Sequence, residues 1–101
     1  MSAADKYALP LPANIVGVPD DGATAELLRL WWKNGEPEMS VRPAITDMRL
    51  MGAILAEASW NLAHAYAQTN QASLGEAVKA LREGWTMGHA RSDAANPGVV
   101  P

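Results

Sequence analysis

The side chains best placed to do chemistry lie in one long apolar segment, which carries Arg49, Trp60 and His64. A histidine that acts as a general base or a metal ligand needs a second polar group close to it. Glu57 precedes His64 by two helical turns, about 10 Å along a helix axis, which is too far to share a metal ion. The alternative is that His64 is a partly buried side chain on a packing surface. The sequence therefore predicts no catalytic residue and no metal site, and these three side chains are candidates for lining a ligand pocket or an interface.

Two consecutive tryptophans, Trp31 and Trp32, must point to opposite sides if they lie in a strand. If Trp32 enters the core, Trp31 lies on the polar face beside Leu27. A large aromatic ring in that position is typical of a protein interface or a ligand platform. The alternative is that the N-terminal segment, residues 7–18, folds over Trp31.

Arg29 and Arg42 can bind an anion together if neighbouring strands bring them to one face. The alternative is that they pair with Glu36 and Glu38 as ordinary surface ion pairs. The chain has no cysteine, which excludes disulfides, thiolate metal sites and cysteine nucleophiles. It also has no Gly-rich phosphate loop and no nucleophile elbow, so no cofactor is expected.

The element that positions Trp31 is a predicted β-hairpin over residues 25–42, although this segment also has the composition of a helix. Asn34-Gly35 favours a two-residue turn because both positions tolerate positive φ. That turn places Trp32 opposite Pro37 in a pair without ladder hydrogen bonds, so the amide that Pro37 lacks would point away from the partner strand. One face is then apolar and holds Leu28, Leu30, Trp32, Pro37, Met39 and Val41. The other face carries the charged side chains, with Leu27 and Trp31 as exceptions.

The element that positions Trp60 and His64 is a predicted helix over residues 46–69, with Thr46 or Asp47 as its N-cap. A wide apolar stripe should face the core and lie against the hairpin: Met48, Met51, Ile54, Leu55, Ala58, Leu62, Ala65 and Tyr66. The opposite side combines Trp60 with small residues, which indicates a second packing surface within the chain or between two copies. Charged residues inside this segment argue against a membrane span.

A second helix is predicted over residues 73–88, after a loop at residues 69–72. Ser73 and Glu76 have the spacing of a capping box, and Gly88 can end the helix. Residues 92–101 are expected to be a mobile tail, and residues 1–24 an extended segment in which residues 14–18 can add one short strand. The predicted fold is a single two-layer α+β domain over residues 1–91, a β-hairpin packed on two antiparallel helices.

Composition limits the partners and the cellular location that are expected for this chain. The chain has 101 residues, a net charge of −3 and eight scattered lysines and arginines, so nucleic acid is not an expected partner. No basic start followed by a continuous apolar run marks a secretory signal, which makes a cytoplasmic location the expectation.

The residues Leu28 to Trp31, Val41-Arg42-Pro43 and Ala63 to Tyr66, followed by a late helix near Trp85, resemble a family of short bacterial proteins known only as a domain of unknown function. The resemblance implies a small α+β domain and no catalytic or binding residues. Two apolar surfaces remain that the predicted core does not use, Trp31 with Leu27 and Trp60 with its small neighbours. They favour a non-enzymatic domain that forms a homodimer or binds another protein. The alternative is a protein or enzyme that binds a small ligand, with anions among the candidates, in a pocket between sheet and helices.

Overall fold

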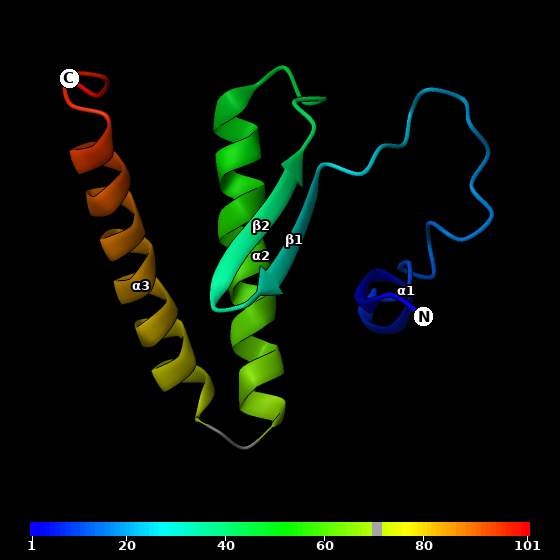
Figure 1. Cartoon of the computed structure of the whole chain (residues 1–101), viewed down its shortest axis with the longest axis horizontal. Helices are drawn as coiled ribbons and strands as arrows, with labels where there is room; N and C mark the ends of the chain where they lie inside the picture. Colours follow the sequence, from blue (N-terminus) through cyan, green and yellow to red (C-terminus); the bar gives the residue numbers. More distant parts are fainter. Residues whose placement is uncertain (70–71) are drawn as a thin grey trace. The chain divides into compact units, whose positions relative to one another are not determined.

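The structure is a computed structural model of the chain, and it describes residues 1–69 and 72–101. Five elements follow one another: α1 (Ala3–Tyr7), β1 (Leu28–Lys33), β2 (Glu36–Val41), α2 (Met48–Gln68) and α3 (Leu74–Ala95) (Figure 1). The predicted α+β class is confirmed. The chain divides into two compact units, Met1–Ala44 and Ile45–Pro101, and each is described by itself. Residues 70 and 71 of the predicted loop lie outside the described residues.

The hairpin of the first unit has the predicted turn and register. Asn34 and Gly35 both have positive φ, 50° and 81°, as a two-residue turn with the twist of a hairpin requires. Lys33 lies opposite Glu36 and Trp32 opposite Pro37, and the register continues to Leu28 opposite Val41. The Arg42 amide donates to the Leu27 carbonyl at 2.9 Å. Because bonded pairs alternate in an antiparallel ladder, Trp32 and Pro37 form a pair without ladder hydrogen bonds, and Pro37 removes a donor from the outer edge of β2.

The N-terminal segment differs from the expected extended chain, because residues Ala3–Tyr7 form the short helix α1. Ser2 caps this helix: its hydroxyl oxygen accepts from the Asp5 amide at 3.2 Å, and the Asp5 carboxylate accepts from the Ser2 amide at 3.3 Å. Hydrogen bonds from the Ser2 side chain, and then from its backbone, hold the pKa of Asp5 below its ordinary value. The cap therefore contributes fully above the ordinary pKa of an aspartate and is lost as the pH falls through the lowered pKa.

Residues 14–18 do not add a strand, and the sheet of the described residues has two strands. The Ile15 amide donates to the Pro12 carbonyl at 2.9 Å, and the Val18 amide donates to the Ile15 carbonyl at 3.1 Å. Gly17 has a φ of 77°. These bonds close local turns, so the backbone donors that a strand would need are used within the segment itself.

The second unit consists of α2 and α3, which run in opposite directions (Figure 1). Asp47 is the N-cap of α2 and accepts from the amides of Arg49 at 3.0 Å and Leu50 at 3.3 Å. Ser73 caps α3 by accepting from the Glu76 amide at 3.2 Å. Both caps fall where the sequence places them, because a short side-chain oxygen satisfies the free amides of the first turn.

Helix α3 continues beyond Gly88 to Ala95, so the predicted end of this helix at residue 88 is wrong and residues 92–95 are not part of a tail. A glycine inside a helix costs about 1 kcal/mol relative to alanine, and the alanine-rich sequence that follows Gly88 outweighs it. The last turn closes at Asn96, whose side-chain amide donates to the Ser92 carbonyl at 2.8 Å.

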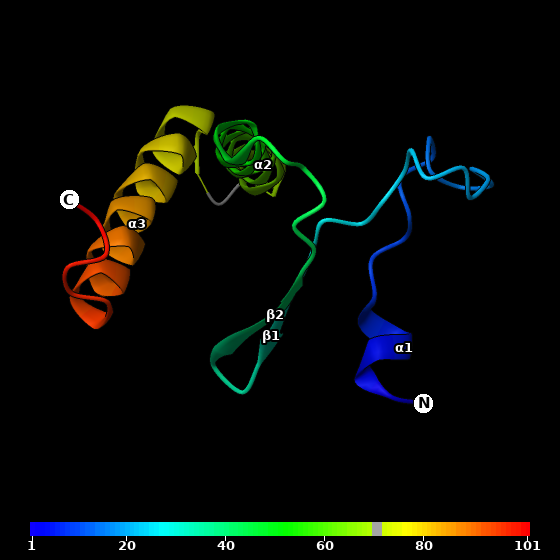
Figure 2. The same ribbon diagram turned by 90° about the horizontal axis from the view of Figure 1, so that it is seen from above.

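The contact between the two helices buries small residues. Ala63 of α2 is 0% exposed and Ala77 of α3 is 6% exposed, and these are the only buried residues in the described part of the chain. The helices diverge toward the C-terminal end of α3 (Figures 1 and 2). The side of α2 that faces α3 is thus the side with Trp60 and the small residues, and this second packing surface lies within the chain. That the other stripe of α2 covers the hairpin stays a prediction.

None of the helices in residues 1–69 and 72–101 combines the length and the apolar content that a bilayer crossing requires.

Candidate functional site

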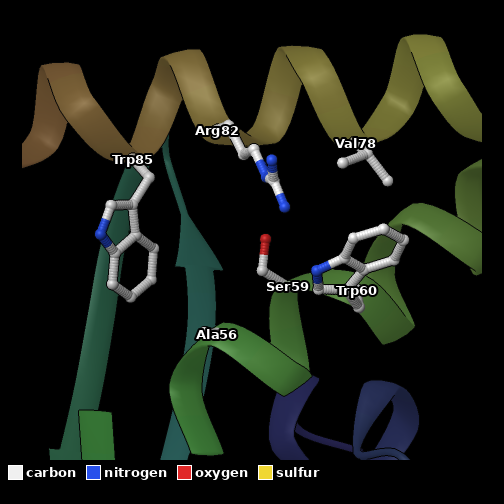
Figure 3. A pocket seen from close by; sticks show the side chains of 6 residues that line it. All are labelled: Ala56, Ser59, Trp60, Val78, Arg82 and Trp85. Carbon is white, nitrogen blue, oxygen red and sulfur yellow. The ribbon is translucent and has the colours of Figure 1, made fainter. Parts of the chain in front are cut away.

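A hollow of about 170 Å³ lies between α2 and α3. In α2 two lining side chains come three and four residues after the first, and in α3 they come four and seven residues after the first, so each set occupies one helical face. The lining residues are Ala56, Ser59 and Trp60 from α2, and Val78, Arg82 and Trp85 from α3 (Figure 3).

The hollow exists because the two helices diverge beyond a contact between small residues. The close approach at Ala63 and Ala77 holds the helices together near the loop. Beyond it the helices diverge, and the rings of Trp60 and Trp85 extend into the gap, while Ala56 is too small to fill the space opposite. The result is an apolar hollow with tryptophan walls, open on one side.

One positive charge enters this apolar hollow. The guanidinium of Arg82 lies over the ring of Trp60, 5.6 Å from its centroid, and at an exposed site this cation–π contact contributes about 0.5–1 kcal/mol. The Ser59 hydroxyl points toward Arg82 (Figure 3). Within residues 1–69 and 72–101 the only ion pair joins Arg29 to Glu26, so no described carboxylate neutralises Arg82.

Of the predicted site residues in this unit, only Trp60 lines the hollow. His64 and Arg49 are exposed on α2 and do not line it. The sequence did not indicate Arg82 as a site residue. The available signal was its position between Val78 and Trp85, which puts a charge on the apolar face of α3.

In the first unit, the structure brings Arg29 and Arg42 to one face, as the register predicts. Both line a hollow of about 200 Å³ together with Glu26 and Ser40. Arg29 pairs with Glu26 at 3.0 Å, and not with Glu36 or Glu38. This pair is more than half exposed, so it contributes little stability. Binding of an anion by the two arginines stays a prediction.

Trp31 and Leu27 are half-buried, and Trp31 lines a hollow of about 240 Å³ with residues 7–12 of the N-terminal segment. The same hollow includes Leu28 and Leu30 of the opposite face, so the segment lies beside β1, and that it folds over Trp31 stays a prediction. The apolar side chains of the opposite face are exposed, except for Leu28, which is half-buried. We call Leu28, Leu30, Trp32, Pro37, Met39 and Val41 the hairpin face; Leu30 is 59%, Trp32 75%, Met39 57% and Val41 71% exposed.

Comparison with known proteins gives a family and a fold. A family model described as "Domain of unknown function (DUF5076)" matches residues 8–91, which confirms the resemblance to an uncharacterised family. A solved structure described as that of a "putative pyruvate dehydrogenase" from the photosynthetic bacterium Rhodopseudomonas palustrus CGA009 is similar, with a TM-score of 0.60 and 22% identity. The match covers 92% of this chain and 88% of that chain, and at this identity it shows the fold alone. No curated protein matches the chain.

Proposed function

We propose that this chain, which belongs to the DUF5076 family of domains of unknown function, is a non-enzymatic interaction domain that pairs with a second copy of itself. The observation that carries this proposal is the exposed hairpin face, on which every side chain is apolar. The activity named for the similar solved structure describes that protein, and a likeness of 22% identity supports the fold and no reaction.

A two-stranded hairpin is at best marginally stable in water, so its apolar face needs a cover. Burying Leu30, Trp32, Met39 and Val41 contributes roughly 6–12 kcal/mol before the entropy of ordering is subtracted. The second unit buries only two alanines, and α2 leaves Met48, Leu62 and Tyr66 exposed. Each unit thus carries apolar surface that it does not cover itself, and this supports pairing with a second copy.

Self-association supplies the cover by symmetry, because a two-fold axis brings the same surface of two copies into contact. The hairpin face is suited to this role since it combines a tryptophan and a methionine with aliphatic side chains, and aromatic residues and methionine are enriched at the centres of interfaces. The opposite face of the hairpin carries charged side chains that keep it in water.

Sedimentation equilibrium of the purified chain tests the proposal. We expect a dimer at micromolar concentration, and we expect Met39→Lys to convert it to a monomer because a charge would be buried in the interface. Glu38→Lys is the matched control, since the neighbouring residue points to the opposite face and its substitution should leave the dimer intact.

Circular dichroism of the Met39→Lys variant separates loss of association from loss of folding, and Val41→Lys provides a second test at the far end of the face. A wild-type chain that stays monomeric at high concentration would show that the hairpin face is covered within one chain, and the proposal would be wrong.

A further inference from the structure

We propose that the hollow between α2 and α3 binds a small carboxylate with a flat apolar body, about the size of one aromatic ring. This is a second property, independent of self-association, and it rests on the charge, the walls and the volume of the hollow.

The charge selects an anion. Arg82 brings a guanidinium into the hollow, and no carboxylate of the described residues pairs with it. A guanidinium offers two parallel N–H donors that match the two oxygens of a carboxylate. Its position over the Trp60 ring limits the orientations of the fork before a ligand arrives. Ser59 adds a hydroxyl on the same side (Figure 3).

The walls select an apolar body. Apart from Arg82 and Ser59, the lining consists of two tryptophans, a valine and an alanine. Tryptophan rings offer flat surfaces on which another ring can stack in an offset or tilted geometry. A ligand that places its carboxylate at Arg82 would lay its body between Trp60 and Trp85.

The volume limits the size of the ligand. The hollow measures about 170 Å³, and an apolar cavity of about 150 Å³ accommodates one benzene ring. For nine non-hydrogen atoms in an open hollow, a Kd on the order of 1 mM is expected. Benzoate is therefore a suitable probe of the class, and benzyl alcohol is its uncharged match in size and shape.

The experiment is a titration of the full chain followed by two-dimensional NMR of the indole N–H groups of its four tryptophans. Benzoate should shift the signals of Trp60 and Trp85 in a saturable manner and leave those of Trp31 and Trp32 in place. Benzyl alcohol should bind at least about tenfold more weakly, since it cannot form the charged hydrogen bonds to Arg82.

The variant Arg82→Gln should weaken benzoate about tenfold and leave benzyl alcohol unaffected. Arg91→Gln is the control, because Arg91 is exposed on α3 as Arg82 is, carries the same charge and does not line the hollow. The Met39→Lys variant should bind benzoate as the wild type does, which separates this site from self-association.

Three results would overturn the proposal: no saturable shift at Trp60 and Trp85, equal binding of benzoate and benzyl alcohol, or equal weakening by Arg82→Gln and Arg91→Gln. The last result would assign the effect to net charge and not to the hollow.

Discussion

At the scale of single residues, the helix pair depends on two alanines. Ala63 is fully enclosed where α2 meets α3, and Ala77 lies almost as deep. Small side chains there let two helix backbones approach closely, and that approach sets the separation of Trp60 and Trp85 further along.

Ala63→Leu should therefore destabilise the chain by about 1–3 kcal/mol, because three additional carbon atoms have no space at the contact. Urea unfolding followed by circular dichroism measures the change. The matched control is Ala80→Leu, at an exposed alanine of α3, which should change the stability by less than about 0.5 kcal/mol. Equal effects of the two substitutions would mean that Ala63 is not at a tight contact.

The candidate site could be predicted from the sequence only in part. Trp60 was identified because a large ring among small residues marks a packing surface. Arg82 was missed because an arginine on an amphipathic helix is ordinarily assigned to solvent, and only the position of the facing helix shows what its guanidinium contacts. His64 and Arg49 were chosen for their chemistry, which does not determine whether a side chain turns toward α3.

At the scale of elements, local signals decided what could be predicted. The Asn34-Gly35 turn fixed the register of β1 and β2, because positive φ at two successive positions admits few other structures. The end of α3 and the existence of α1 were missed. In both places weak preferences compete. In α3 the low helix propensity of Gly88 competes with the alanines after it, and in α1 the helix cap Ser2 competes with the prolines that follow.

The continuation of α3 through Gly88 makes a prediction of its own. Gly88→Ala should stabilise the chain by about 0.5–1 kcal/mol, since the glycine is inside a helix and an added methyl group meets nothing within 4 Å. Thermal and urea unfolding measure the change. A loss of stability would instead indicate that the helix ends at this residue.

Gly35→Ala is the contrasting substitution, because Gly35 has a φ of 81°. It should destabilise the chain by about 1–2 kcal/mol, since a side chain strains the left-handed conformation. The two glycines are thus expected to respond to the same added methyl group with opposite signs.

At the scale of the whole molecule, a dimer has a stability that depends on concentration. A tenfold increase in protein concentration should stabilise the pair by about 1.4 kcal/mol and raise its Tm by about 3 °C. Differential scanning calorimetry at several concentrations measures this shift. The Glu38→Lys variant should show the same dependence and the Met39→Lys variant none. A Tm that is constant across concentrations for the wild type would contradict association.

The pairing of larger surfaces could not be predicted from the sequence. The pattern of α2 identifies two apolar sides, but it does not say which of them meets α3. The structure shows that the side with Trp60 does, which leaves Met48, Leu62 and Tyr66 exposed for another surface.

Pro37 has a further consequence for a chain with so apolar a hairpin. The outer edge of β2 lacks one amide at Pro37, the second residue of the strand, so another extended chain cannot add there in an unbroken ladder. The proline therefore hinders growth of a fibre by addition of strands at this edge. It does not hinder contact between two copies through the hairpin face. The proline therefore favours an assembly that stops at a finite number of chains.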